Sequence, residues 1–337
     1  MASFAPRDTL VLTADEVRTL DDDARDRLLD DAVTQGIGDV IIEIDDVAPE
    51  LSTAVTARGL RLLIGVTCFH EHGEVAFGPE RALRPIDEAG QPRRRLEWYV
   101  GLLPTDAVVV AELVARCSRL ASTPGVSGLV LDFIRWPLHW ELELRADGPR
   151  QPESSFDRIT LGDFSARTGC VVSADPTEAA AQIFSRHRQV WDRYRADTIT
   201  RLVRLLADIA HARGIMLGAF VLPHGRASVG QDIAAWEGVV DALYPMTYHA
   251  ILHRPARWVG DVIGEIEEET SIPAVPIIQL TAAAEHSGGW DWGDDVDGVQ
   301  LEEAITAGGT RGPVGFFPGT ALRLLPEVQT VETERAR

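Results

Sequence analysis

Eight short runs of β-branched and apolar residues alternate with longer stretches of helical periodicity along this 337-residue chain. Repeated strand–helix units of this kind predict a parallel sheet covered by helices. Chains of this length usually divide into domains, but the (β/α)8 barrel forms one unit at this size. We therefore expect an α/β protein with a single (β/α)8 TIM barrel over residues 1–326 and an acidic C-terminal tail over 327–337. The expected strands are Thr9–Thr13, Asp39–Asp45, Arg61–Thr67, Gly128–Phe133, Ile215–Leu222, Val240–Tyr244, Ala274–Leu280 and Pro313–Phe317.

Helix signals fill the intervals between these strands. Thr13 followed by Glu16 is a capping-box pattern, and Gly36 supplies a stop, which together predict one helix over residues 13–35. Apolar residues recur with a 3.6-residue period within Ala179–Arg213, which predicts the helix that leads into the fifth strand. Weaker helical patterns cover Arg257–Glu269 and Val299–Ala307.

Two long insertions break the regular spacing, one over residues 70–104 after the third strand and one over about 135–173 after the fourth. Both follow the carboxyl end of a strand, which is the face where barrel enzymes place their chemistry. Long loops inside a compact domain are often functional. Both carry aromatic residues, so we expect them to form the walls of one cleft. These aromatics are Trp98, Tyr99, Trp136 and Trp140.

Composition narrows the possible functions. A net charge of −20 disfavours general binding to nucleic acid or to an anionic membrane, because such binding depends on cations. The chain contains no lysine, which excludes Schiff-base aldolases, pyridoxal-phosphate enzymes and P-loop NTPases. The three cysteines fit neither a zinc site nor a disulfide framework. Without a signal-peptide pattern or a membrane-spanning run, we expect a cytoplasmic protein whose oligomeric state is left open.

Asp132 is the most informative single residue. It ends a strand that is otherwise apolar, and Arg135, Trp136, His139 and Glu141 follow within nine positions. A carboxylate at such a position is either solvated in a cleft or paired with a cation. Two interpretations follow, a structural Asp132–Arg135 ion pair and a catalytic carboxylate whose pKa the nearby arginine keeps low. The crowding of polar and aromatic residues favours the catalytic one.

The run LDFIRWPLHWE around Asp132 resembles the fourth-strand signature of bacterial sugar-hydrolase-like barrels. The preceding RPIDEAGQPRRRLEWYVGLLPT is similar to the linker of that group, and VDALYPMTYH over residues 240–249 is similar to its sixth strand and, more distantly, to chitinase-like barrels. The resemblance spans about residues 60–250 and implies a glycoside hydrolase. Chitinase-like barrels carry Asp-x-Glu at the end of the fourth strand, whereas Ile134 stands two residues after Asp132 here. Their substrate-assisted mechanism therefore does not transfer directly.

Glycoside hydrolysis generally needs two carboxyl groups. Glu43 lies in the apolar second strand, and alternation places it on the same face as Asp45. A buried acid there is either catalytic or held in a salt bridge. If it is catalytic, its oxygens should lie about 5–10 Å from those of Asp132. Glu141, on the loop after the fourth strand, is the rival candidate.

Several further residues are candidates for binding a neutral sugar or small glycoside, because indole faces stack on sugar rings and polar groups bond hydroxyls. Tyr244 and Met246 share the face of Tyr248, but we interpret those two as core. The predicted substrate-binding residues are Arg135, Trp136, His139, Trp140, Trp98, Tyr99, Tyr248, His249, Gln279, Trp290 and Asp291.

Three classes of function remain open: a glycosidase, a metal-dependent sugar isomerase or lyase, and a carbohydrate-binding barrel without catalysis. His70-Glu-His72 has the form of a metal-binding motif. It follows the third strand, however, and no later strand end offers a matching ligand set. We therefore expect no metal and no cofactor, and we favour the glycosidase.

Overall fold

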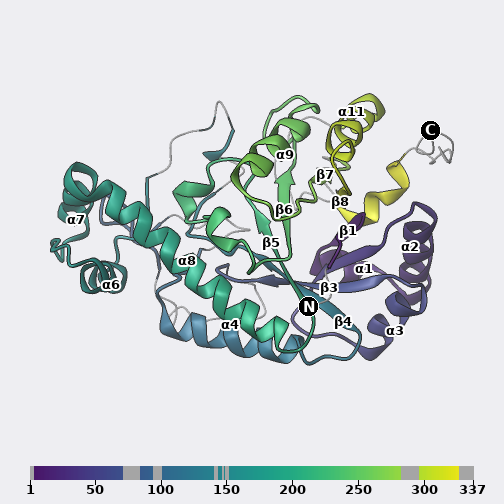
Figure 1. Cartoon of the computed structure of the whole chain (residues 1–337), viewed down its shortest axis with the longest axis horizontal. Coiled ribbons are helices and arrows are strands. Elements are labelled where there is room, and N and C mark those ends of the chain that lie inside the picture. The colour runs from purple at the N-terminus through teal and green to yellow at the C-terminus, as the bar shows by residue number, and fades with distance from the viewer. Residues whose placement is uncertain are drawn as a thin grey trace.

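The computed structural model describes residues 4–70, 84–93, 101–139, 143–145, 148, 152–281 and 296–325. Eight parallel strands form a closed barrel in sequence order, and β8 pairs with β1 to complete it (Figure 1). The predicted (β/α)8 architecture is confirmed. The strands are β1 (Thr9–Leu12), β2 (Asp39–Glu43), β3 (Arg61–Thr67), β4 (Val126–Asp132), β5 (Met216–Val221), β6 (Ala242–Thr247), β7 (Ile277–Gln279) and β8 (Gly315–Phe317).

Helices surround this barrel. In Figure 1, α2 and α3 lie beside one another, α4 runs along the long α8, and α9 packs beside α11. The smaller α6 and α7 lie beyond the end of α8 that is farther from the barrel. The bounds are α1 (Ala14–Thr19), α2 (Asp22–Thr34), α3 (Pro49–Ala57), α4 (Ala107–Leu120), α6 (Arg158–Thr168), α7 (Pro176–Gln182), α8 (Arg188–His211), α9 (Trp258–Glu269) and α11 (Gly298–Gly309), with short helical turns η1 (Ile183–His187), η2 (Arg226–Val229), η3 (Ala234–Trp236) and η4 (Gly319–Leu324).

The first helical region differs from the expectation of one continuous helix. The Thr13–Glu16 capping box is present and begins α1, but Leu20 has an extended backbone that ends this helix. The Asp21 side chain then accepts a hydrogen bond from the backbone N–H of Ala24 and caps α2. Because the Asp21 side chain bonds a backbone N–H at the start of α2, the first helix ends and a second one begins at this point.

Alternation along the strands creates two apolar layers. One set of side chains faces the helices, and the other, which includes Val11, Ile41, Leu63, Val130 and Met216, fills the barrel. Tyr244 and Met246 belong to the inner set and are 0% and 7% exposed, which confirms them as core.

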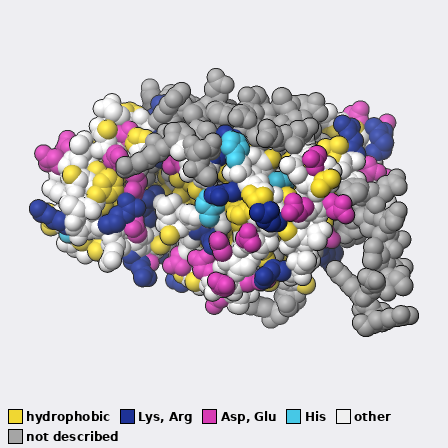
Figure 2. Space-filling view, turned by 90° about the horizontal axis from the view of Figure 1, so that it is seen from above, with side chains coloured by type: hydrophobic (Ala, Val, Ile, Leu, Met, Phe, Trp, Pro, Cys, Tyr) yellow, Lys and Arg dark blue, Asp and Glu magenta, His cyan; other side chains and the backbone are white. Residues whose placement is uncertain are grey.

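Charge at the amino-terminal end of the barrel is neutralised inside the protein. Asp39 is fully buried, and both of its carboxylate oxygens accept hydrogen bonds from the Arg61 guanidinium at 2.6 Å. On the outer surface in Figure 2, acidic side chains are interspersed with arginines, so on that face the excess negative charge is not gathered into one patch.

The cysteines are not linked to one another. Cys68 and Cys117 are buried free thiols, and burial raises the pKa of Cys117 to about 12, which keeps this thiol protonated and unreactive. Cys170 is free and half-buried.

Within the part of the chain that the structure describes, no helix has the length and apolar character needed to cross a membrane.

Candidate active site

Two carboxyl groups meet at the carboxyl-terminal mouth of the barrel. Asp132 is the last residue of β4, and Glu43 is the last residue of β2. Each lies two positions after an inward-facing apolar residue, Val130 and Ile41, so both side chains follow the inner layer. The Glu43 and Asp132 side chains form a hydrogen bond with one another. The two side chains therefore point toward one another.

A glycine on the strand between them permits this contact. Glu43 pairs with Gly65 of β3, and β3 separates β2 from β4. A Cβ atom placed on Gly65 would lie only 2.7 Å from Cγ of Glu43. The Glu43 side chain therefore lies across β3 in space that any other residue would fill, and this route brings it to Asp132.

Burial dominates the electrostatics of Asp132, which is 8% exposed. Burial raises the pKa of Asp132 to about 6, although the Phe133 N–H, the Arg135 charge and the hydrogen bond from Glu43 each act to lower it. The Phe133 N–H donates to Oδ1 of Asp132 at 2.7 Å. The sequence-based expectation of a low pKa for this group is therefore wrong, because desolvation outweighs the nearby guanidinium.

The pKa of Glu43 is raised as well. Burial raises the pKa of Glu43 well above its ordinary value, and the charges of Asp132 and Glu16 raise it again. Two carboxyls in contact titrate as a pair, and each one disfavours ionisation of the other. The predicted separation of about 5–10 Å is wrong, because a hydrogen-bonded pair is closer than that.

Glu16 is a third acidic residue whose charge affects Glu43. From its sequence pattern it was predicted only to cap a helix. Its Oε2 accepts hydrogen bonds from the N–H and hydroxyl of Thr13 at 2.9 and 3.1 Å. Its Oε1 accepts from the N–H and hydroxyl of Thr320 at 2.9 and 2.7 Å. Thr320 follows β8, so Glu16 joins the loops after the first and last strands and holds a negative charge near Glu43. The sequence signal was an acid just after a strand end.

Arg135 shapes the loop beyond Asp132. It is 2% exposed, its Nη1 donates to the Leu138 carbonyl at 2.9 Å, and its guanidinium lies 5.0 Å from the centre of the Phe133 ring. Phe133 has a φ of +48°, a left-handed conformation that is uncommon for a bulky residue. Strain of this kind is frequent at functional sites.

Trp136 and His139 are more enclosed than sugar-binding side chains in an open cleft would be. Trp136 is 0% exposed; its indole N–H donates to the Arg195 carbonyl at 3.1 Å, and the Arg195 guanidinium lies 5.4 Å from its ring. It therefore packs against α8. His139 is 3% exposed, and its backbone N–H donates to Glu143 at 2.8 Å.

The candidates on β6 and β7 are also enclosed. Tyr248 is 6% exposed and stacks on Phe317 with ring centres 5.2 Å apart. Gln279 is fully buried; its amide oxygen accepts from the Ile251 N–H at 3.1 Å, and its amide nitrogen donates to the Thr281 carbonyl at 3.2 Å. These contacts favour a structural role for Gln279 in holding the loop after β6. His249 is 1% exposed at the start of that loop.

The remaining predicted site residues lie outside the described residues. They are Trp98, Tyr99, Trp140, Glu141, Trp290, Asp291 and His72. The expected grouping of Trp98, Trp136 and Trp140 in one pocket stays a prediction.

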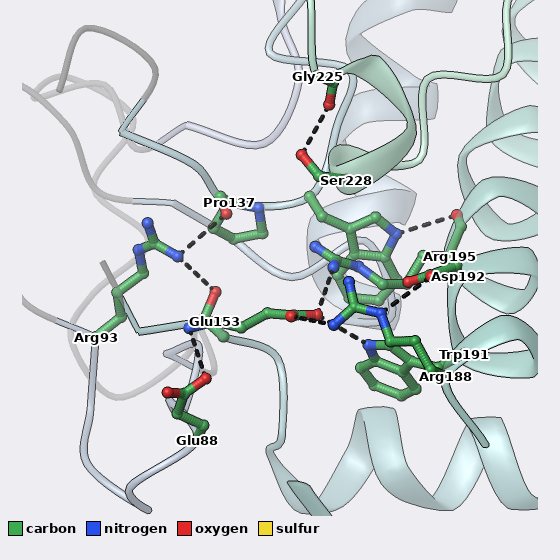
Figure 3. A network of polar contacts seen from close by, with 12 residues as sticks. Glu88, Arg93, Pro137, Glu153, Arg188, Trp191, Asp192, Arg195, Gly225 and Ser228 are labelled. Carbon is green, nitrogen blue, oxygen red and sulfur yellow. Dashed lines mark hydrogen bonds and ion pairs between the residues drawn. The ribbon is translucent and has the colours of Figure 1, made fainter. Parts of the chain in front are cut away.

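The two long loops contact one another in the parts that are described. Arg93, in the loop after β3, donates to the Pro137 carbonyl at 3.2 Å (Figure 3). It also donates to the Ser154 hydroxyl at 2.9 Å and forms an ion pair with Glu143. The Ser155 N–H donates to the Ile86 carbonyl at 2.9 Å. The prediction that these loops lie together at one face of the barrel agrees with these contacts.

Glu153 ties this pair of loops to α8. Its carboxylate accepts from Arg188 at 2.6 Å, from Arg195 at 3.0 Å and from the Trp191 indole at 3.3 Å (Figure 3). Arg195 is 3% exposed, so its charge depends on Glu153 for compensation. The loop that follows the Asp132 motif is thus anchored to the longest helix of the fold.

Among the described residues, no group of three or more His, Cys, Asp or Glu side chains is arranged to hold a metal ion. Glu43 and Asp132 place two carboxyls side by side at this end of the barrel, and burial raises the pKa of both.

The fold of this chain is similar to those of several solved structures. No protein-family model and no curated protein sequence matches the chain. Among solved structures, the glycoside hydrolase domain of PgaB (BpsB) from Bordetella bronchiseptica is similar with a TM-score of 0.68 and 13% identity, over 96% of this chain and 97% of that one. A β-galactosidase from Bacillus circulans sp. alkalophilus is similar with a TM-score of 0.64 and 10% identity, over 93% of this chain and 50% of that one.

An α-galactosidase from Thermus thermophilus is also similar, with a TM-score of 0.51 and 13% identity, over 96% of this chain and 61% of that chain. The chain thus spans about half to three fifths of the two galactosidases and nearly all of the PgaB domain. At these identities the likeness concerns the fold. This chain has a (β/α)8 barrel that is similar in fold to those of these hydrolases.

Proposed function

We propose that the protein is a glycoside hydrolase that acts on a neutral sugar or small glycoside, with Glu43 and Asp132 as its central acid–base unit. The observation that carries this proposal is the contact between the half-buried Glu43 and the buried Asp132 at the carboxyl end of the barrel, where burial raises the pKa of both carboxyls. Barrel enzymes place their chemistry at this end, and glycosidases need an acid that stays protonated near neutral pH.

Glu43 is the proton donor in this scheme, because burial and the charges of Asp132 and Glu16 all raise its pKa, whereas the Phe133 N–H and the Arg135 charge oppose the rise at Asp132. Asp132 is ionised above about pH 6, so it stabilises the positive charge that develops on the sugar ring in the transition state. A hydrogen-bonded pair is too close to straddle a glycosidic bond, since flanking carboxyls lie about 5–9.5 Å apart. A further carboxylate is then required on the opposite side of the bond, and Glu141 is our candidate for it.

The test uses a panel of p-nitrophenyl glycosides with the wild type, Glu43→Gln and an exposed control, Glu302→Gln. We expect hydrolysis by the wild type and the control, and a loss of about 10³-fold or more in Glu43→Gln. On a 2,4-dinitrophenyl glycoside, whose leaving group needs no proton, the loss should be much smaller. Equal losses on both substrates would assign Glu43 a role other than proton donor, and no hydrolysis of any glycoside by the wild type would refute the proposal.

A further inference from the structure

Three loops meet at the carboxyl end of the barrel beside β6. The loop after β4 reaches the loop after β6, because Nε of Arg145 donates to the Ile251 carbonyl at 2.7 Å. It also reaches the loop after β5, where Nε2 of His224 donates to the Leu144 carbonyl at 3.1 Å. In the closed order of eight strands, β6 lies opposite β2, which ends in Glu43. These loops therefore lie across the mouth of the barrel from that carboxyl group.

Arg254, in the loop after β6, has no acidic partner among the described residues. Its Nε is buried without a hydrogen-bond partner, and no side chain or carbonyl in the described part of the chain accepts from its guanidinium. Other enclosed arginines are paired, as Arg195 is with Glu153 and Arg226 with Glu269. The chain has 52 acidic residues against 32 basic ones, so carboxylates are not scarce. Because Arg254 is only half-buried, part of its side chain remains open to a ligand from solvent.

The arginine is nevertheless held in one place. Its guanidinium carbon lies 5.9 Å from the centre of the Trp258 ring, and the half-buried Trp258 begins α9. The Arg254 N–H donates to the His249 carbonyl at 2.8 Å. His253, just before it, has a φ of +54°, a left-handed conformation that few residues other than glycine adopt. A charge fixed in this way loses less conformational entropy when it binds a ligand.

The electrostatic surroundings favour an anion beside Arg254. His224 meets the edge of the Trp258 ring with ring centres 5.9 Å apart, so it belongs to the same group of side chains. Burial lowers the pKa of His224, and the bond to the Leu144 carbonyl opposes this. Among the charges that act on His224, that of Arg254 has the largest effect and lowers the pKa further, ahead of the opposing charge of Glu265. His224 is therefore neutral near pH 7, and the positive charge of Arg254 is left uncompensated.

We propose that Arg254 and Trp258 form a subsite for a carboxylate, which is carried by the sugar or aglycone joined to the neutral sugar that is cleaved. This inference rests on the proposed glycosidase function. A guanidinium binds a carboxylate through two parallel N–H···O bonds, and an indole packs against a sugar ring. The carboxylate belongs on the neighbouring unit, because Glu43 and Asp132 disfavour a further negative charge at the bond that is cleaved.

This subsite discriminates by charge. A neutral unit would leave the guanidinium charge uncompensated, and an ammonium group would be repelled by it. A charge-assisted bidentate contact at a half-buried site should favour an acidic sugar over its neutral counterpart about tenfold or more. Because Arg254 is partly exposed, this preference should decrease as salt is added.

The experiment titrates the wild type, Arg254→Gln, Arg254→Lys and the control Arg257→Gln with D-galacturonate and D-galactose, followed by NMR. Arg257 is exposed and lies three residues further along, so its replacement changes the net charge equally. The indole N–H resonance of Trp258, assigned with a Trp258→Phe variant, reports binding at this subsite. Since Arg254 forms no ion pair with a described residue, the Tm of Arg254→Gln should stay within about 2 °C of the wild type.

We expect the wild type to bind D-galacturonate about tenfold or more tightly than D-galactose and to shift the Trp258 resonance, and Arg254→Gln to lose this preference. Arg254→Lys should keep part of it, because an ammonium cannot form two parallel bonds, and Arg257→Gln should keep all of it. Equal affinity of the wild type for both sugars, or an unchanged preference in Arg254→Gln, would overturn the inference.

The hydrolysis assay separates this inference from the proposed function. If the wild type cleaves neutral glycosides but does not prefer D-galacturonate, only the carboxylate subsite fails. If it prefers D-galacturonate through Arg254 yet cleaves no glycoside, the anion site stands and the glycosidase function fails.

Discussion

Replacing Asp132 with Asn should stabilise the protein and inactivate it at once. The pKa of Asp132 is about 6 in the folded protein against an ordinary value of 3.8, a difference of about two pH units. Each unit corresponds to about 1.4 kcal/mol, so holding this carboxylate ionised at pH 7 costs roughly 3 kcal/mol of folding free energy. Asparagine removes the charge, and its side-chain oxygen can still accept from the Phe133 N–H.

The sign of this effect depends on pH in a defined way. A raised folded-state pKa means that the folded protein binds more protons than the unfolded chain between about pH 4 and pH 6. The wild type therefore loses stability as pH rises through that window, and the loss is complete above it. We expect Asp132→Asn and the wild type to have nearly equal free energies of unfolding at pH 4, and the variant to be more stable by up to roughly 3 kcal/mol at pH 7.5.

Urea unfolding at pH 4, 5.5 and 7.5, together with turnover on a cleaved glycoside, measures both effects. The matched control is Asp39→Asn, in the same barrel at its opposite end, where the carboxylate pairs with Arg61. Breaking that pair should cost about 3–5 kcal/mol. Turnover of Asp132→Asn should fall about 10³-fold or more. A variant that is equally or less stable at pH 7.5, or that keeps normal turnover, would refute our account of Asp132.

Three further outcomes follow from the same site. The pH–rate profile should be bell-shaped, rising near pH 6 as Asp132 ionises and falling at higher pH where Glu43 loses its proton. Glu16→Gln should move the falling limb of that profile to lower pH, since it removes a negative charge that raises the pKa of Glu43; an unmoved limb would exclude this coupling. Gly65→Ala should lower turnover at least tenfold with only a small change in Tm, because its Cβ would displace the flexible Glu43 side chain; wild-type turnover would show that the route across β3 is not needed.

Local patterns were enough to predict the barrel. Each strand is a short apolar run, and its pattern differs from the 3.6-residue period of the helix that follows it. The bounds predicted for the third strand, Arg61–Thr67, are the observed ones. The predicted ends of a strand were wrong where pairing with neighbouring strands decides them. The sixth strand was expected at Val240–Tyr244 but lies at Ala242–Thr247, because its register follows pairing with β5 and β7 rather than the apolar run alone.

The sequence pointed to the two carboxyl residues of the candidate site, but it did not predict the hydrogen bond between them. Two local features of the sequence pointed to this site, since Asp132 ends one apolar strand and Glu43 lies inside another. Their hydrogen bond depends on Gly65, which lies on a third strand, and the pKa of Asp132 depends on burial by the whole barrel. Trp136 shows the same limit: its place in the motif indicated a sugar contact, but the long α8 helix covers it.

The barrel treats its inward-facing carboxyls differently at its two ends, and this contrast bears on function. At the amino end, Asp39 is fully buried, and its two carboxylate oxygens accept hydrogen bonds from Nε and Nη2 of Arg61, so both oxygens are occupied. At the carboxyl end, Glu43 and Asp132 bond to one another instead, and the pKa of each is raised. A chain with 32 basic residues could have placed an arginine between them, as it does with Asp39. A guanidinium there would lower both pKa values and leave no proton to donate near neutral pH. The Glu43–Asp132 pair therefore lowers the free energy of unfolding. It lies at the end of the barrel where enzymes of this fold carry out catalysis.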